Sequence, residues 1–132
     1  MRMPEIGVIA CNSAASNSGV LTGAAAMRLV REAGPGQVGI CSLPALCRGI
    51  PRQVQAVKNL RHRIVVDGCA NACARGVAER LGIACSCYLN LEDDLHIAKR
   101  GPFSTLEVSE EEIGRVLDAL RRIAADLLGK AA

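Results

Sequence analysis

Aromatic residues are almost absent from this chain of 132 residues, which has one Tyr, one Phe and no Trp. Proteins that bind nucleic acids commonly stack bases on aromatic side chains and present a stripe of basic residues. Here 16 Lys and Arg stand against 13 Asp and Glu, and the formal net charge is only +3. We therefore expect no nucleic-acid partner. Because half of the residues are apolar, the core must be built mainly from Ala, Val, Ile and Leu.

Long hydrophobic runs are also missing. A membrane-spanning helix needs about 20 consecutive apolar residues, and no segment approaches that length. The apolar run near the amino terminus is too short for a secretory signal, and no small-residue cleavage site follows it. We therefore expect a cytoplasmic protein without a membrane partner. Domains usually contain roughly 100–150 residues, so a single domain over residues 1–132 is expected.

Cysteine is the one chemically reactive residue type that the chain has in quantity. Seven of the 132 residues are Cys. This is an odd number and about 5% of the chain, below the share of roughly 8–10% that is typical of disulfide scaffolds. In a reducing cytoplasm, patterned cysteines are more often metal ligands or redox thiols than structural bridges. Their places relative to the expected strands therefore decide how they are interpreted.

Short apolar runs alternate with segments of helical periodicity along most of the chain. Strands are expected over residues 5–10, 37–40, 63–66 and 83–89, and helices over residues 20–32, 51–58 and 70–81. Strands that alternate with helices on short links predict a parallel sheet with helices on both faces. We expect an α/β, three-layer Rossmann-like fold with a mostly parallel four-stranded sheet in the order 2-1-3-4.

The carboxyl-terminal part differs from this alternating pattern. Residues 90–106 are rich in charged residues and contain Gly and Pro, which indicates an irregular surface segment. Ser109 and Glu112 have the spacing of a capping box. Apolar residues then recur at helical spacing and predict an amphipathic helix over residues 110–128. Its apolar stripe could either cover the core or mediate a homodimer.

Three cysteines follow the ends of expected strands. Cys11, Cys41 and Cys69 come after the first, second and third strand. The carboxyl ends of parallel strands emerge at one edge of the sheet, where ligands of open α/β sheets bind, so we expect these thiols to converge. Cys73 lies about one helical turn after Cys69 and can face the same side. Four thiolates suit a tetrahedral zinc ion or, as an alternative, an iron–sulfur cluster.

A polar loop over residues 12–18 joins the first strand to the first helix. The backbone N–H groups of such a loop can surround an oxyanion. Cysteine-dependent phosphatases and arsenate reductases have a similar cysteine and loop, followed by an Arg six residues after the cysteine. Here that position holds Asn17, so charge developing on a phosphoryl group has no evident cationic partner. We interpret the loop as a turn and helix cap.

The residues around Asp67, Gly68 and Cys69 resemble a known family. The segment over residues 65–76 reads VVDGCANACARG and resembles the central motif of the DGC-domain family, small bacterial and archaeal proteins to which zinc binding is ascribed. Three further segments are similar to that family, with the sequences IACNSAASNSGVLTGAA, ICSLPALCRGIP and YLNLEDDLHIAKRG. The resemblance covers about residues 5–100.

The resemblance places the family's potential zinc ligands on four cysteines of this chain, which are Cys11, Cys41, Cys69 and Cys73. These are the cysteines that the strand-end argument brings together. The other three cysteines, Cys47, Cys85 and Cys87, are additions to the family pattern. Cys47 is either loop filler or a redox partner of Cys41. Cys85 and Cys87 are interpreted as small buried hydrophobic residues, and the alternative is a thiol patch near the sheet, because alternate residues of a strand share a face.

Three functions are compatible with this cysteine pattern. The first is a zinc-binding protein with a four-cysteine site at the carboxyl edge of the sheet. Such a closed shell disfavours hydrolysis by a zinc-bound water. The second is a thiol-redox or thiol-transfer enzyme with Cys11 as nucleophile, so the sequence leaves open whether the protein is an enzyme. The third is a module that binds a soft oxyanion, such as arsenite, or another small anion.

Overall fold

Four parallel strands form the centre of the molecule, whose computed structural model describes residues 3–129. The strands are β1 (Ile6–Ala10), β2 (Val38–Ile40), β3 (His62–Asp67) and β4 (Cys87–Asn90). They form one sheet in the order β2-β1-β3-β4, and each neighbouring pair is parallel. The predicted fold class and strand order are confirmed. The first two and last three residues of the predicted domain lie outside the described residues.

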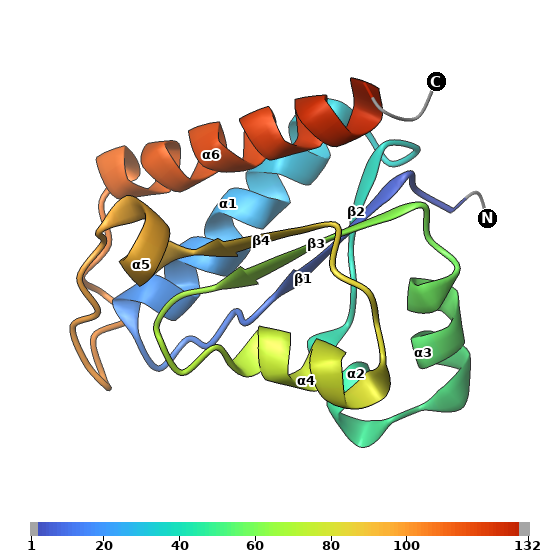
Figure 1. Cartoon of the computed structure of the whole chain (residues 1–132). Helices are drawn as coiled ribbons and strands as arrows, with labels where there is room; N and C mark the ends of the chain where they lie inside the picture. Colours follow the sequence, from blue (N-terminus) through green and yellow to red (C-terminus); the bar gives the residue numbers. More distant parts are fainter. Residues whose placement is uncertain (1–2, 130–132) are drawn as a thin grey trace.

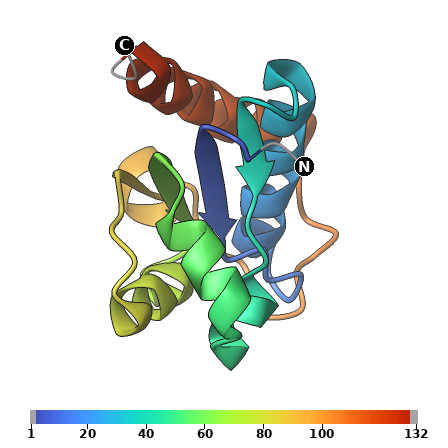
Figure 2. The same cartoon turned by 90° about the vertical axis from the view of Figure 1, so that its right-hand side faces the viewer.

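Helices cover both faces of the sheet, which gives the predicted three layers (Figure 1). One face carries α1 (Asn17–Ala33), α5 (Leu91–Leu95) and α6 (Glu110–Gly129), and the other carries α2 (Leu43–Arg48), α3 (Pro51–Lys58) and α4 (Cys73–Leu81). Figure 2 shows the sheet between the two helical layers. Alternate residues of a strand point to opposite faces, so Val8 enters the core beneath α1 and α6, and Ile9 enters the core beneath α2, α3 and α4.

Helix α6 is stabilised by its cap and by burial of its apolar stripe. The Glu112 N–H donates to Ser109 Oγ at 3.1 Å, and the Ser109 N–H donates to Glu112 Oε1 at 3.1 Å. These two bonds confirm the capping box. The stripe packs against α1 and closes the core with Ile113, Val116, Leu117, Leu120, Ala124 and Leu127. Of the two roles expected for this stripe, the structure shows core cover.

Two short helices were not predicted from the sequence. Helix α2 occupies a segment that was expected to be a loop, and α5 lies inside the segment expected to be irregular. Each has six residues or fewer, too few to show a helical period. Local caps stabilise them instead, because Ser42 Oγ accepts from the Ala45 N–H, and Asn90 Oδ1 accepts from the N–H groups of Glu92 and Asp93.

Three further element boundaries differ from the prediction. Helix α1 begins at Asn17 instead of residue 20, because Ser16 caps it by accepting from the Gly19 N–H. Helix α4 begins at Cys73 instead of residue 70, because Ala72 has a left-handed backbone conformation with φ of 51°. Strand β4 begins at Cys87 instead of residue 83. Within residues 3–129, no helix combines the length and the hydropathy that a transmembrane span requires.

Candidate thiol site

Three of the four predicted site cysteines line one cavity at the carboxyl edge of the sheet. Cys11 follows β1, Cys69 follows β3 after Gly68, and Cys73 is the first residue of α4. Together they line a cavity of about 160 Å³. The chain passes from β1 to β2 on one side of β1 and then crosses to β3 on the other side. The cavity therefore lies at the topological switch point of the sheet, where ligands of such folds bind.

Thr22 of α1 fixes the turn that carries Cys11. The Thr22 hydroxyl accepts from the Asn12 N–H at 2.9 Å and donates to the Gly19 carbonyl at 2.8 Å. Cys11 Sγ lies 3.7 Å from the same hydroxyl. Asn12 has a φ of 46°, which lies in the left-handed region that Asn tolerates better than most residues. The chain therefore turns sharply after β1 and leaves Cys11 half-buried at the wall of the cavity.

Gly68 brings the loop after β3 close to the beginning of α1. A Cβ atom at this position would lie 2.7 Å from the backbone carbon of Ser18 and 2.9 Å from the backbone nitrogen of Gly19. Because backbone atoms cannot yield as a flexible side chain does, only glycine fits this approach. Beyond it, Asn90 Nδ2 donates to the Cys69 carbonyl at 2.8 Å, which ties the loop to the end of β4.

Asp67 holds the beginning of α4 and thereby positions Cys73. Its side chain is buried, with 1% exposed. Asp67 Oδ1 accepts from the Ala74 N–H at 2.8 Å, and Oδ2 accepts from the Arg75 N–H and the Tyr88 hydroxyl, each at 3.0 Å. The carboxylate therefore caps the amino terminus of the helix, where a negative charge is favourable. Burial raises the pKa of Tyr88 to about 12, so its hydroxyl remains a donor.

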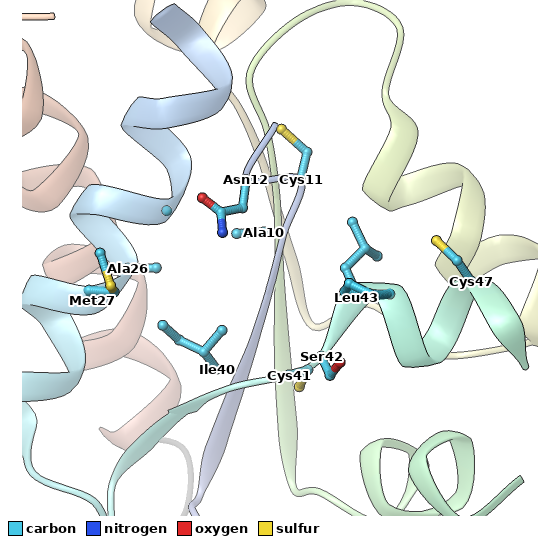
Figure 3. A pocket seen from close by; sticks show the side chains of 12 residues that line it. Ala10, Cys11, Asn12, Ala26, Met27, Ile40, Cys41, Ser42, Leu43 and Cys47 are labelled. Atoms are coloured by element: carbon cyan, nitrogen blue, oxygen red, sulfur yellow. The ribbon is translucent and has the colours of Figure 1, made fainter. Parts of the chain in front are cut away.

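Cys41 lies outside this three-cysteine cavity. Its Sγ is directed at Gly7 on β1, where a Cβ atom would come within 2.8 Å of the sulfur. In Figure 3 the thiols of Cys11 and Cys41 point in opposite directions. Cys41 instead lines a neighbouring cavity of about 440 Å³ that also includes Cys11 and Cys47. Burial raises the pKa of the Cys41 thiol to about 11, so it is protonated at neutral pH and is a weak ligand in that form.

Lys99 and Asp67 are the charged side chains that line the cavity. Lys99 Nζ donates to Cys69 Sγ at 3.5 Å. The pKa of the Cys73 thiol is raised, first by burial, then by Asp67, and then by the neighbouring thiols of Cys69 and Cys11. Lys99 acts in the opposite direction. The thiols of Cys69 and Cys11 are therefore close enough to Cys73 to oppose the ionisation of its thiol.

Lys99 was missed in the sequence, and Asn17 explains its position. The fully buried side chain of Asn17 donates from Nδ2 to the Ala98 carbonyl at 3.0 Å and accepts at Oδ1 from the Arg100 N–H at 2.7 Å. Asn17 therefore holds both neighbours of Lys99, more than 80 residues away along the chain. No local sequence pattern predicts a contact at that separation. The sequence did show that position 17 holds Asn where a cysteine phosphatase has Arg.

The donor set suits a thiophilic metal ion in its chemistry but not in its present arrangement. Thiolates are soft ligands that bind zinc. Among residues 3–129, however, no three His, Cys, Asp or Glu side chains are arranged to hold one metal ion. Cys11, Cys69 and Cys73 share a cavity without converging on a point, so binding one ion requires these thiols to change rotamer. A site with Cys41 as well requires that thiol to leave its contact with Gly7.

The remaining cysteines lie outside the three-cysteine cavity. Cys47 is exposed on α2 and lines the cavity of about 440 Å³ with Cys41. Cys85 is exposed and Cys87 is half-buried. The interpretation of Cys85 as a buried hydrophobic residue is therefore wrong, because the chain is outside the sheet from residue 84 to 86 and β4 begins only at Cys87.

The fold and the cavity define a doubly wound α/β protein with a thiol-lined site at its switch point. The family model of the DGC domain matches residues 7–120, and the chain therefore belongs to the DGC-domain family. The match confirms the resemblance found in the sequence and extends it into α6. Comparison with the curated proteins and with the solved structures gives no match.

Proposed function

We propose that this protein binds a thiophilic metal ion, zinc in the first instance, through the thiolates of Cys11, Cys69 and Cys73. The observation that supports the proposal is that two segments far apart in the sequence, one after β1 and one after β3, together contribute three cysteines to one cavity at the switch point. Zinc is the ion that such a soft ligand set suits best among the common divalent ions. The proposal leaves out Cys41, the fourth ligand expected from the sequence, because its thiol is directed at Gly7 and does not line this cavity.

Three protein ligands would leave one coordination position for a ligand from outside the chain. A site of this kind suits exchange or delivery of the ion better than a purely structural role. All seven cysteines are free thiols, which supports the further proposal that the protein works in the reducing cytoplasm.

Zinc affinity of cysteine variants, measured by competition with a chelator, tests this proposal. We expect Cys11→Ser, Cys69→Ser and Cys73→Ser each to weaken zinc binding by at least about tenfold, since each removes one thiolate ligand. Cys41→Ser and Cys85→Ser are matched controls and should retain the affinity of the unsubstituted protein. Equal losses in the Cys41 variant and the Cys73 variant would contradict the three-cysteine assignment.

A second candidate is reduction of disulfides, which the neighbouring thiols of the same cavity favour. The Cys11 thiolate would attack one sulfur of a substrate disulfide, form a mixed disulfide and expel the other sulfur as a thiolate. Cys69 or Cys73 would then attack Cys11 Sγ and release the second thiolate, so that the substrate gains two electrons and the protein retains one disulfide. Cys11→Ser should abolish the fast phase of the reduction of a small aromatic disulfide and the protein disulfide to Cys11 that follows it, with Cys85→Ser as the control. Unchanged reduction by the Cys11 variant would refute this candidate.

A further inference from the structure

Lys99 brings a positive charge into the three-cysteine cavity without a carboxylate partner. Its ammonium group contacts the Cys69 thiol at 3.5 Å and forms no ion pair among residues 3–129. The other charged side chain that lines the cavity is Asp67. Its two oxygens are already engaged by the start of α4 and by Tyr88. The cavity therefore has a half-buried cation whose charge is only weakly compensated.

We propose that this cavity binds a small inorganic oxyanion of the size of phosphate, with the Lys99 ammonium as its counter-charge and Asn17 as the residue that positions Lys99. The proposal shares the cavity of the proposed thiol site but depends on a different set of residues. A charge-assisted hydrogen bond from an ammonium group is among the strongest contacts that a protein can offer such an ion.

The segment that carries Lys99 is firmly attached to the beginning of α1. Besides the two bonds of the Asn17 side chain, Ser104 Oγ accepts from the Asn17 N–H at 3.1 Å. The Phe103 N–H donates to the Ala15 carbonyl at 2.6 Å. The segment is therefore held against the beginning of α1, and Lys99, the residue of this segment that lines the cavity, has a defined place there. Asn17 occupies the position at which a cysteine phosphatase has its Arg. Here the Asn17 amide binds the backbone on both sides of Lys99, so Lys99 supplies the positive charge.

Hydroxyl groups and the size of the cavity restrict the ligand further. Ser13, Ser16 and Ser18 also line the cavity. Ser16 Oγ accepts from the Gly19 N–H at 3.1 Å and lies 3.4 Å from Ser18 Oγ. One of these two hydroxyls donates to the other, which leaves the second O–H free to donate to an oxygen of the ligand. A volume of about 160 Å³ admits an ion of a few heavy atoms and is smaller than the cavities that usually bury a drug-sized ligand.

Titration of the metal-free, fully reduced protein with inorganic phosphate tests the proposal. The backbone amide signals of the nitrogen-15-labelled protein are followed by NMR at constant ionic strength. We expect saturable shifts at Ser16, Ser18, Gly19 and Cys69. Lys99→Gln should weaken binding by at least about tenfold, the equivalent of one charge-assisted hydrogen bond, whereas Lys99→Arg should retain it. Lys58→Gln removes the same charge from the exposed end of α3 and should bind phosphate as the unsubstituted protein does.

The role of Asn17 has a separate readout. Asn17→Ala should weaken phosphate binding to the level of Lys99→Gln, and adding Lys99→Gln to it should cause little further loss, because both changes remove the same cation from the cavity. If Asn17→Ala fails to fold, the comparison of Lys99→Gln with the unsubstituted protein still tests the proposal, because Lys99 is only half-buried. Shifts that grow without saturation, or equal affinity in the Lys99→Gln variant, would overturn the proposal.

Two further measurements distinguish this proposal from zinc binding in the same cavity and from binding of an organic phosphate. Cys73→Ser should weaken zinc binding and keep phosphate binding, whereas Lys99→Gln should weaken phosphate binding and removes no zinc ligand, so each proposal can fail without the other. Methyl phosphate identifies the source of the oxyanion. Weaker binding than inorganic phosphate is expected for a free ion, and tighter binding would contradict the assignment to a small inorganic ligand.

Discussion

The buried carboxylate of Asp67 offers the sharpest test of how the site is held together. Asp67→Asn retains the shape of the side chain and leaves one oxygen to accept from the Ala74 N–H. Its amide nitrogen then faces the Arg75 N–H, which loses its acceptor. The negative charge at the amino terminus of α4 is lost as well. A lost cap costs about 1 kcal/mol and a lost charge at a helix terminus up to about 1 kcal/mol, so we expect a total destabilisation of about 2 kcal/mol.

Urea unfolding at neutral pH measures this loss directly. For a chain of this length, about 2 kcal/mol corresponds to a decrease in Tm of about 8 °C. Tyr88→Phe is the matched control, because it removes the hydroxyl that donates to Asp67 and leaves the helix cap intact. We expect it to cost about 1 kcal/mol. In the Asp67→Asn background its cost should fall by at least about 0.5 kcal/mol, since the shared bond is already changed.

The reasoning fails if Asp67→Asn unfolds within about 0.5 kcal/mol of the unsubstituted protein. That result would mean that the negative charge and the two bonds to Oδ2 contribute nothing net to stability. Strict additivity of the two substitutions would contradict the contact between Asp67 and Tyr88. The same variant bears on function, because α4 begins at Cys73 and a loosened helix start moves this thiol relative to Cys69.

One further substitution and one alkylation experiment each test a single contact of the site. Gly68→Ala should destabilise the fold by about 1–3 kcal/mol in urea unfolding, because its Cβ would lie 2.7 Å from the Ser18 backbone. Gly76→Ala is the control and should be tolerated, because a Cβ at that position meets no neighbour. Alkylation of Cys41, followed by mass spectrometry, should be slow at neutral pH and rise without a plateau up to about pH 11, because the thiol must lose its proton to react. A plateau near pH 9 would show that the Cys41 thiol is not buried in solution.

The strand order could be predicted because each strand of the sheet leaves a local signal. Short β-branched runs alternate with helical segments, and this alternation allows few topologies. The same logic placed Cys11 and Cys69 at one edge, since residues that follow β1 and β3 must emerge there. Helices α2 and α5 escaped prediction because their stability comes from single capping contacts rather than from a periodic apolar face.

The direction of a side chain and the contacts of distant segments were beyond prediction. Cys41 emerges at the expected edge, but its thiol is directed at Gly7, and only the missing Cβ of that residue leaves room for it. Lys99 contacts Cys69 across a separation of 30 residues. Its place depends on the buried amide of Asn17, whose partners lie in a segment without a strand or helix of its own. Such contacts follow from the packed fold and not from the local sequence.

The metal content of protein purified without oxygen and without an affinity tag tests the central claim most directly, with free thiols counted on the same sample. The account predicts about one zinc per chain, with Cys11, Cys69 and Cys73 shielded from alkylation until a chelator is added. Metal-free protein in which these three thiols react at once, and which takes up no zinc when it is supplied, would contradict the account.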